Sequence, residues 1–333
     1  MDLSTTYLGL RLPSPLVVGA SPLCDDIGMV RRLEDAGAAA IVMHSVFEEQ
    51  ITRERTRTAA DLDAHVDAFA EAHSFLPRPP EFHLAPDEYL EQIRRIRAAV
   101  AIPVIGSLNG VTAAGWLDYA RLIQDAGASA LELNTYYIAS DPSEDSASVE
   151  RRTLDIVRAV KRAVAIPIAV KLSPFFSALA HFAAALEAAG ADGIVLFNRF
   201  FQPDIDIAEL EVRPVHHSSE PSELLLRLRW LAILSGQRRL DLAATGGIGD
   251  ARDVIKAVMA GAHAVQMVSA LLVHGPAHLG DVAHDVARML EQLGYASLAE
   301  MRGCMNLARC PDPGAFERAN YIRVLHSWRD PRS

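Results

Sequence analysis

The feature that most limits what this chain can fold into is a short pattern, repeated four times, in which a helix ends at a glycine and an apolar strand follows. It occurs as "EDAGAAAIVM" (34–43), "QDAGASALEL" (124–133), "EAAGADGIVL" (187–196) and "VMAGAHAVQM" (258–267). Glycine readily takes the left-handed conformation that closes a helix, and a continuous apolar run is typical of a strand covered on both faces. The repeat therefore predicts helices that alternate with parallel strands.

Proline marks the start of two further strands. In "VAIPVIGSLN" (100–109) and "VAIPIAVKLS" (164–173) it prevents the preceding helix from continuing into the apolar run. The apolar segments "SPLVVGAS" (14–21) and "RLDLAATGGI" (239–248) bring the number of strands to eight. We predict that the strand cores span residues 16–18, 39–43, 103–107, 130–133, 167–171, 193–197, 241–244 and 264–267.

Eight alternating units of this kind predict an α/β fold, and more specifically a (β/α)8 TIM barrel. A doubly wound open sheet is the alternative, although it has no need of eight such units. We expect the N-terminal "TYLGLRLPSP" to form a hairpin under the barrel floor, and residues 44–86 and 199–225 to form long loops at the C-terminal face. The chain then divides into a barrel domain, 1–303, and a C-terminal extension, 304–333, that packs on the barrel or at a subunit interface.

Composition excludes several classes of function. The net charge of −10 is opposite to the basic surface that nucleic acid binding requires, and no apolar run is long enough to span a membrane. The N-terminus has neither the basic start nor the apolar core of a signal peptide. Cys24, Cys304 and Cys310 are too few for a disulfide framework or an iron–sulfur cluster. We therefore expect a cytoplasmic protein that binds neither nucleic acid nor membranes and holds no metal.

A lysine ends the fifth predicted strand. Lys171 follows an apolar run, 168–170, and a lysine in that setting needs an anion or a functional role to offset the burial of its ammonium. The alternative is a side chain that runs along the barrel wall with its amine in solvent. Lys171 is therefore a candidate functional residue.

Two glycines end the seventh predicted strand. Gly246 and Gly247 precede a helix, so their main-chain N–H groups are available to an anion. The loops after strands seven and eight commonly bind phosphate in such barrels, and Val268 and Ser269 of the eighth loop can add further N–H groups. A tight turn with nothing bound is the alternative. The order of the strands favours a phosphate site.

Asparagines end two more strands. Either Asn134 or Asn198 alone could simply cap a turn, but two at equivalent strand ends favour the binding of a planar ligand that carries amide groups. Together, the phosphate loop, the lysine and the two carboxamides predict a phosphorylated cofactor that lies over the barrel mouth.

The chain resembles the soluble, class 1 dihydroorotate dehydrogenases over about residues 8–303. The motifs that carry the resemblance stand in the same order: "GLRLPSPLVVGASPL", "LELN", "AVKLSP", "IVLFN", "ATGGIGDARDVIKAVMAGAHAVQMVSALL" and "LGYASLAEMRG". That family consists of FMN-containing (β/α)8 enzymes, so the resemblance implies this fold and this cofactor. Related class 1 enzymes are dimers, which implies a homodimer here.

The resemblance also implies roles for single residues. Lys171 is expected beside the N1/O2 edge of the flavin, where a cation stabilises the anionic reduced form. Asn134 and Asn198 are expected to bind the substrate, with Asn134 also in contact with the flavin. The other implied cofactor-binding residues are Ala20 and Ser21 at the isoalloxazine, Asn109, and Gly246, Gly247, Val268 and Ser269 at the phosphate.

The substrate side departs from the family pattern. The position of the family's proton-removing Cys or Ser falls on Tyr137 in "LNTYYIAS", and a phenol is a poor base at neutral pH. His44 replaces a lysine beside flavin and substrate and is a better candidate base, because imidazole titrates near neutrality. His73 replaces the first asparagine of the substrate loop, and Arg199 follows Asn198 where the family has serine.

Three hypotheses about function remain. The first is an FMN-dependent oxidoreductase that moves a hydride from a CH–CH or related bond of a small polar substrate to flavin N5, with Lys171, Tyr137 and His44 as candidate catalytic residues. The second is a genuine dihydroorotate dehydrogenase of pyrimidine synthesis with an atypical base, which the altered loop disfavours. The third is a non-catalytic flavin- or partner-binding barrel, which the lysine and the phosphate loop disfavour. The electron acceptor stays unknown, and the sequence lacks a dinucleotide-binding motif.

Overall fold

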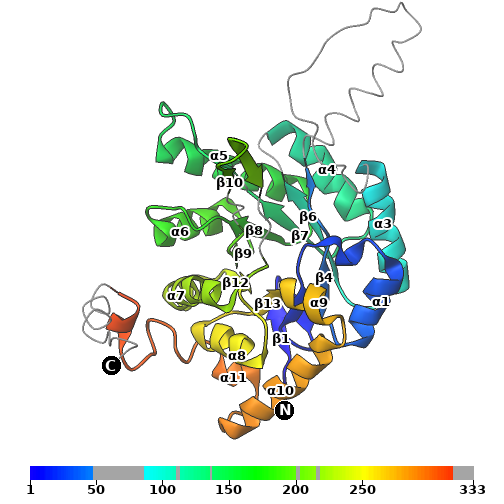
Figure 1. Cartoon of the computed structure of the whole chain (residues 1–333), viewed down its shortest axis with the longest axis vertical. Coiled ribbons are helices and arrows are strands. Elements are labelled where there is room, and N and C mark those ends of the chain that lie inside the picture. The colour runs from blue at the N-terminus through cyan, green and yellow to red at the C-terminus, as the bar shows by residue number, and fades with distance from the viewer. Residues whose placement is uncertain (48–85, 110–112, 136, 200–202, 215–217, 318–333) are drawn as a thin grey trace, which may run out of the picture.

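The computed structural model describes residues 1–47, 86–109, 113–135, 137–199, 203–214 and 218–317 (Figure 1). Its centre is a closed barrel of eight parallel strands, in which β4 pairs with both β3 and β6. Closure rules out the open sheet, and each strand lies within two residues of its predicted position. In order around the barrel the strands are β4 (Ala40–Val42), β3 (Leu16–Val18), β13 (Ala264–Met267), β12 (Asp241–Thr245), β9 (Gly193–Leu196), β8 (Ile168–Leu172), β7 (Ala130–Asn134) and β6 (Val104–Asn109).

Helices lie outside the strands, as Figure 1 shows for α5 to α8 on one side and α1 and α3 on the other. The glycines of the four repeats, at positions 37, 127, 190 and 261, all have φ between 98° and 123°. A residue with a side chain rarely adopts this conformation, so the predicted helix ends are confirmed. The helices are α1 (Ile27–Asp35), α3 (Pro86–Ala99), α4 (Ala113–Asp125), α5 (Ser146–Ala163), α6 (Leu179–Ala189), α7 (Leu224–Leu234), α8 (Ala251–Ala260), α9 (Ser269–His274), α10 (His278–Gln292) and α11 (Leu298–Met301).

Small apolar side chains fill the lower part of the barrel interior. A single buried cluster combines the strand residues Ala40, Ala130, Ala169, Ala243 and Ala264 with side chains of the N-terminal hairpin. This hairpin, β1 (Thr5–Tyr7) and β2 (Leu10–Leu12), closes the floor as predicted. Because alternate residues of a strand face inward, the polar residues further along the same strands enter the barrel only near its C-terminal mouth.

The long connection after β9 contains an element that the sequence did not predict. It is an antiparallel hairpin of β10 (Pro203–Asp206) and β11 (Glu211–Pro214), with four exposed aliphatic side chains: Ile205, Ile207, Leu210 and Val212. The connection after β4 begins with a short strand, β5 (Val46–Phe47), which pairs with β6. Residues 48–85 lie outside the described part of the chain.

The beginning of the C-terminal extension packs on the barrel. The N–H of Met305 donates to the carbonyl of Met259 in α8, and that of Leu307 donates to the carbonyl of Ala232 in α7, each at 2.9 Å. The boundary at 303 stays a prediction, as does any helix beyond residue 317. Among the helices of the described residues, none is long and apolar enough to cross a bilayer.

A half-buried histidine at the barrel floor makes stability depend on pH. His263 Nδ1 accepts a hydrogen bond from the Leu242 N–H at 3.0 Å. Burial, and then the charge of Arg302, lower the pKa of His263 to about 4. The folded state therefore binds this proton less readily than the unfolded state. Stability from this residue is fully present above pH ~6.5 and is lost as pH falls towards 4, by about 2.5 kcal/mol at pH ~4.5.

We expect a His263→Asn variant to lose this dependence, since an amide oxygen can accept the same N–H without titrating. The measurement is urea unfolding of both proteins between pH ~7 and ~4.5. Asp241, whose pKa burial raises, lies 3.4 Å from His263 Nε2, so both proteins are compared in an Asp241→Asn background, where its opposite contribution is absent. Parallel stability curves for the two proteins would contradict the prediction.

Candidate functional site

A cavity of about 440 Å³ lies at the C-terminal ends of the strands. It brings together residues that are far apart in sequence, at the place where such barrels bind their ligands. Nine of the residues predicted from sequence line it: Ala20, Ser21, Lys171, Asn198, Arg199, Gly246, Gly247, Val268 and Ser269.

Lys171 is buried and ion-paired at this mouth. Its Nζ donates to Oε1 of Glu132 at 3.1 Å, and the other carboxylate oxygen of Glu132 accepts from Gln266 Nε2 at 2.5 Å. All three side chains are buried, with Glu132 only 1% exposed. The stem of Lys171 therefore does not carry its amine to bulk solvent, and the alternative considered for it is wrong. Within the described part of the chain Nζ donates to Glu132 alone, so two of the three donor hydrogens of the ammonium can meet a ligand in the cavity that Lys171 lines.

The Gly246–Gly247 turn forms a tightly packed wall of the same cavity. A Cβ on Gly247 would lie 2.5 Å from the main-chain nitrogen of Leu224, and one on Gly246 would lie 2.7 Å from Arg227 Nη2. Within the described residues, the N–H groups of Gly246, Gly247, Val268 and Ser269 donate to no other main-chain group. The turn thus offers main-chain donors to an anion.

A buried arginine stands behind this turn. Arg227 of α7 is 6% exposed and lines the cavity, and its Nε donates to the carbonyl oxygen of Thr245 at 2.9 Å. Its Nη1 donates to the carbonyl of Glu223 at 2.7 Å, and its Nη2 lies 3.3 Å from the Glu223 carboxylate. Arg227 holds the end of β12 in place and adds positive charge beside the predicted phosphate site.

The two strand-end asparagines are paired. Asn198 Nδ2 donates to Asn134 Oδ1 at 2.7 Å. Among the described residues this hydrogen bond does not use the amide nitrogen of Asn134, a donor, or the carbonyl oxygen of Asn198, an acceptor. Asn109 ends the neighbouring strand, where it is the register partner of Asn134 and is buried. Asn109 does not line the cavity among the described residues, so its predicted cofactor contact stays a prediction.

Tyr137 and Lys171 line different cavities among the described residues, and the role of Tyr137 as base stays a prediction. Its hydroxyl donates to Glu144 at 2.7 Å, and the guanidinium of Arg152 lies 4.3 Å from the centre of its ring. It lines a second cavity, of about 470 Å³, between the loops after β7 and β8 and helix α5. The structure therefore does not bring Tyr137 to Lys171.

His44 stands after β4, which β6 separates from β7 in the barrel. Its Nδ1 lies 2.8 Å from Oδ1 of Asp25, and its ring packs edge-on against Tyr89. His44 is not among the described residues that line the cavity of Lys171. His73 lies outside the described residues, as does Tyr136.

Sequence reasoning missed three residues of the mouth: Glu132, Gln266 and Arg227. A signal existed for the first two, since "LELN" and "AVQM" each interrupt a buried strand with a polar side chain, and a buried polar group needs a partner. Arg227 lies in a helix rich in leucine and arginine and had no such signal. Its role follows from the packing of α7 against β12.

The fold and the mouth define a (β/α)8 barrel built to hold an anionic ligand beside a buried ammonium. The model of the family described as dihydroorotate dehydrogenase matches residues 84–290 of the 333, which is more than half of the chain. The chain belongs to the dihydroorotate dehydrogenase family of oxidoreductases, and the resemblance noted in its motifs is confirmed.

Curated relatives extend the similarity to nearly the whole chain. The chain is 28% identical to the catalytic subunit of dihydroorotate dehydrogenase B (NAD(+)) of Thermoplasma acidophilum, over 91% of this chain and 98% of that protein. It is 25% identical to the NAD-dependent dihydropyrimidine dehydrogenase subunit PreA of Escherichia coli (strain K12), over 92% and 77%. It is 27% identical to dihydroorotate dehydrogenase A (fumarate) of Lactobacillus delbrueckii subsp. bulgaricus, over 64% and 71%. The names of these relatives differ in both substrate and electron acceptor.

Proposed function

We propose that this protein is an FMN-dependent oxidoreductase that takes a hydride from a CH–CH or related bond of a small polar substrate. The observation that carries the proposal is that the buried Lys171 and the Gly246–Gly247 turn line one cavity. A phosphate held at the turn and a planar anion beside the ammonium together match FMN.

The residues present fit this cofactor. The cavity volume of about 440 Å³ lies in the range of cofactor sites. Main-chain donors of the Gly246–Gly247 turn, together with the Arg227 charge, suit a phosphate. Ala20, Phe197 and Val268 offer apolar surface to a ring system in the same cavity as Lys171.

The buried residues would stabilise negative charge during the reaction. Bound FMN supplies a two-electron acceptor for the hydride. Lys171 places a fixed positive charge in a site of low dielectric, where a preorganised charge acts far more strongly than in water. Glu132 orients the ammonium, and Gln266 in turn holds the carboxylate. This chain of contacts fixes the ammonium before any substrate arrives.

The asparagine pair indicates the class of substrate. Within the described residues, the amide nitrogen of Asn134 and the carbonyl oxygen of Asn198 are not used in this pair, and they complement the N–H and C=O edge of a cyclic amide. Two relatives are named for dihydroorotate or dihydropyrimidine dehydrogenation, and both names denote cyclic amides with a CH–CH bond. We therefore propose a dihydropyrimidine-like cyclic amide as the substrate of this enzyme, in a homodimer as in related enzymes.

Anaerobic reduction of the flavin tests this proposal. The purified protein is expected to carry about one FMN per chain and to bleach when a cyclic amide substrate is added without oxygen. Dihydrouracil and dihydroorotate are the first two probes. Bleaching by dihydroorotate would support a genuine dihydroorotate dehydrogenase with an atypical base. A colourless protein that also refuses added FMN would refute the proposal, and a flavoprotein that no CH–CH donor bleaches would support the non-catalytic barrel.

A further inference from the structure

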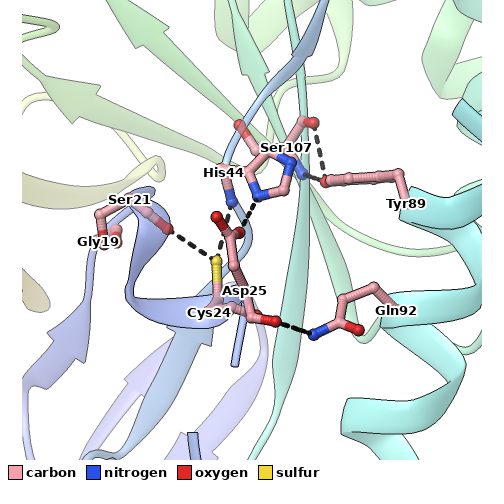
Figure 2. Close-up of polar contacts among 8 residues, drawn as sticks. All are labelled: Gly19, Ser21, Cys24, Asp25, His44, Tyr89, Gln92 and Ser107. Carbon is pink, nitrogen blue, oxygen red and sulfur yellow. Dashed lines mark hydrogen bonds and ion pairs between the residues drawn. The ribbon is translucent and has the colours of Figure 1, made fainter. Parts of the chain in front are cut away.

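Three side chains with metal-binding atoms meet at the rim of the barrel, outside the cavity of the proposed function. Sγ of Cys24, a carboxylate oxygen of Asp25 and a ring nitrogen of His44 all lie within 4.8 Å of one another. Figure 2 shows Cys24 and Asp25, from the turn after β3, reaching His44 after β4. Among the described residues this is the one group of three or more such side chains.

The Asp25–His44 contact is close without being a hydrogen bond. Oδ1 of Asp25 and Nδ1 of His44 are 2.8 Å apart, yet the buried Oδ1 has no hydrogen-bond partner among the described residues. A protonated imidazole would make this contact an ion pair. With a neutral imidazole, a metal cation placed between the two atoms would hold them together, because both atoms offer lone pairs to metals.

The backbone that carries the three side chains is held by buried neighbours. Gln92 of α3 is buried, and its Nε2 donates to the carbonyl oxygens of Cys24 and Asp25 at 3.2 Å and 2.9 Å. The N–H of His44 donates to Sγ of Cys24 at 3.2 Å. Tyr89 of α3 packs against the His44 ring and exchanges two hydrogen bonds with the backbone of Ser107 (Figure 2). Partners of this kind orient metal ligands in known sites.

We propose that Cys24, Asp25 and His44 bind a transition-metal ion of the Zn²⁺ type. A thiolate, an imidazole and a carboxylate form a ligand set that suits Zn²⁺, with bonds of about 2.0–2.3 Å. The Cys24 thiol donates at present to the Ser21 carbonyl. On binding, its S–H bond breaks, the S–metal bond forms and the proton leaves to solvent. Three protein ligands leave a fourth position open to water or to another oxygen ligand.

This site gives His44 a different role from the one predicted from sequence. As a ligand through Nδ1, the imidazole holds the metal instead of accepting a proton from the substrate. The inference does not depend on FMN, because none of the three ligands lines the cavity proposed for it. It replaces the expectation of a protein without metal.

Cobalt spectroscopy tests the site directly. The purified holoprotein is stripped with a chelator and loaded with Co²⁺, and its absorption is compared with that of the same protein loaded with Zn²⁺, so that any flavin signal cancels. We expect one tightly bound ion per chain and a thiolate-to-Co²⁺ charge-transfer band. Cys24→Ser should abolish the band, and Asp25→Asn or His44→Gln should weaken Zn²⁺ binding at least about 10-fold.

Two further variants, one a control and one a test of the supporting contacts, separate a metal site from a structural cluster. Cys310→Ser removes another buried thiol and should leave the band and the affinity unchanged. Gln92→Leu leaves every ligand in place and should weaken Zn²⁺ binding about 10–100-fold, with folding verified by circular dichroism. Absence of the band in the folded wild-type protein, its survival in Cys24→Ser, or its loss in Cys310→Ser would each overturn the proposal.

Discussion

Replacing Lys171 with methionine is expected to lower the free energy of unfolding by about 3–5 kcal/mol. The substitution keeps an unbranched, flexible side chain but leaves Glu132, which is 1% exposed, without its cation at 3.1 Å. An unpaired carboxylate in such a place is costly, because no group there replaces the lost cation. Urea unfolding of the variant and the wild type at neutral pH measures the loss.

The double variant Lys171→Met with Glu132→Gln is the matched control. It removes both charges, and a glutamine oxygen can still accept from Gln266 Nε2, which now donates to Glu132. We expect its stability to return to within about 1.5 kcal/mol of the wild type, as found when buried ion pairs are replaced by neutral groups. If the double variant is as unstable as Lys171→Met, the loss of the Lys171–Glu132 ion pair is not the cause of the lower stability.

Function should not return with stability in this double variant. The proposed role of Lys171 is to place positive charge beside the flavin, and the neutral pair cannot do this. The rate of anaerobic flavin reduction by substrate should therefore stay at least about 100-fold below the wild-type rate, a typical loss for one electrostatic group in an active site. A double variant that is stable and also reduces its flavin at the wild-type rate would contradict the role of Lys171 in the proposed function.

The second large effect is expected at Gly247. Alanine at this position would place its Cβ 2.5 Å from the main-chain nitrogen of Leu224 and 2.9 Å from the carbonyl oxygen of Glu220. Neither atom can rotate away as a side chain could, so the turn itself must move. The turn also has φ +74°, which alanine rarely adopts. We expect FMN affinity to fall at least about 100-fold, equivalent to about 2.7 kcal/mol.

Gly294→Ala separates backbone strain from the collision. Gly294 has nearly the same φ, +78°, but a Cβ there would meet nothing within 4 Å, and Gly294 does not line the cavity. Its substitution should reduce stability by about 1–2 kcal/mol and leave FMN binding unchanged.

Fluorescence titration with FMN and with riboflavin tests whether the turn holds the phosphate, since Gly247→Ala should weaken the binding of FMN much more than that of riboflavin. Equal losses for both ligands would mean that the turn does not hold the phosphate.

The barrel could be derived from sequence because its signals are local. A glycine such as Gly190 ends a helix in each of the four repeats. A proline, Pro103 or Pro167, precedes two of the strands. Each of these residues restricts the backbone conformation of its immediate neighbours. Apolar runs of four or five residues then fix which segments are buried strands. Since parallel strands with helical crossovers have few alternatives, these local signals suffice for the order and the closure of the barrel.

The residues of the candidate site could be predicted only where a polar residue or a glycine stands within or directly after an apolar strand. Lys171, Asn134, Asn198 and the Gly246–Gly247 turn are anomalies within or directly after apolar runs, and all of them lie at the mouth. Tyr137 was placed by its match to a family motif, and the loop after β7 instead carries it to Glu144 and Arg152. A loop is not held by strand register, so position along the chain does not fix where its side chains point.

The sequence by itself determined the barrel, its eight strands and the residues that stand at their ends, because helix stops, strand starts and burial are encoded within a few neighbouring residues. Only the tertiary structure decided which of those residues meet. Glu132 and Gln266 are 134 residues apart and touch because the strands close into a ring. Cys24 contacts His44 because the turn after β3 packs beside the end of β4. Arg227 contacts the Gly246–Gly247 turn because α7 packs on β12. Such contacts depend on distances in space that no local pattern specifies.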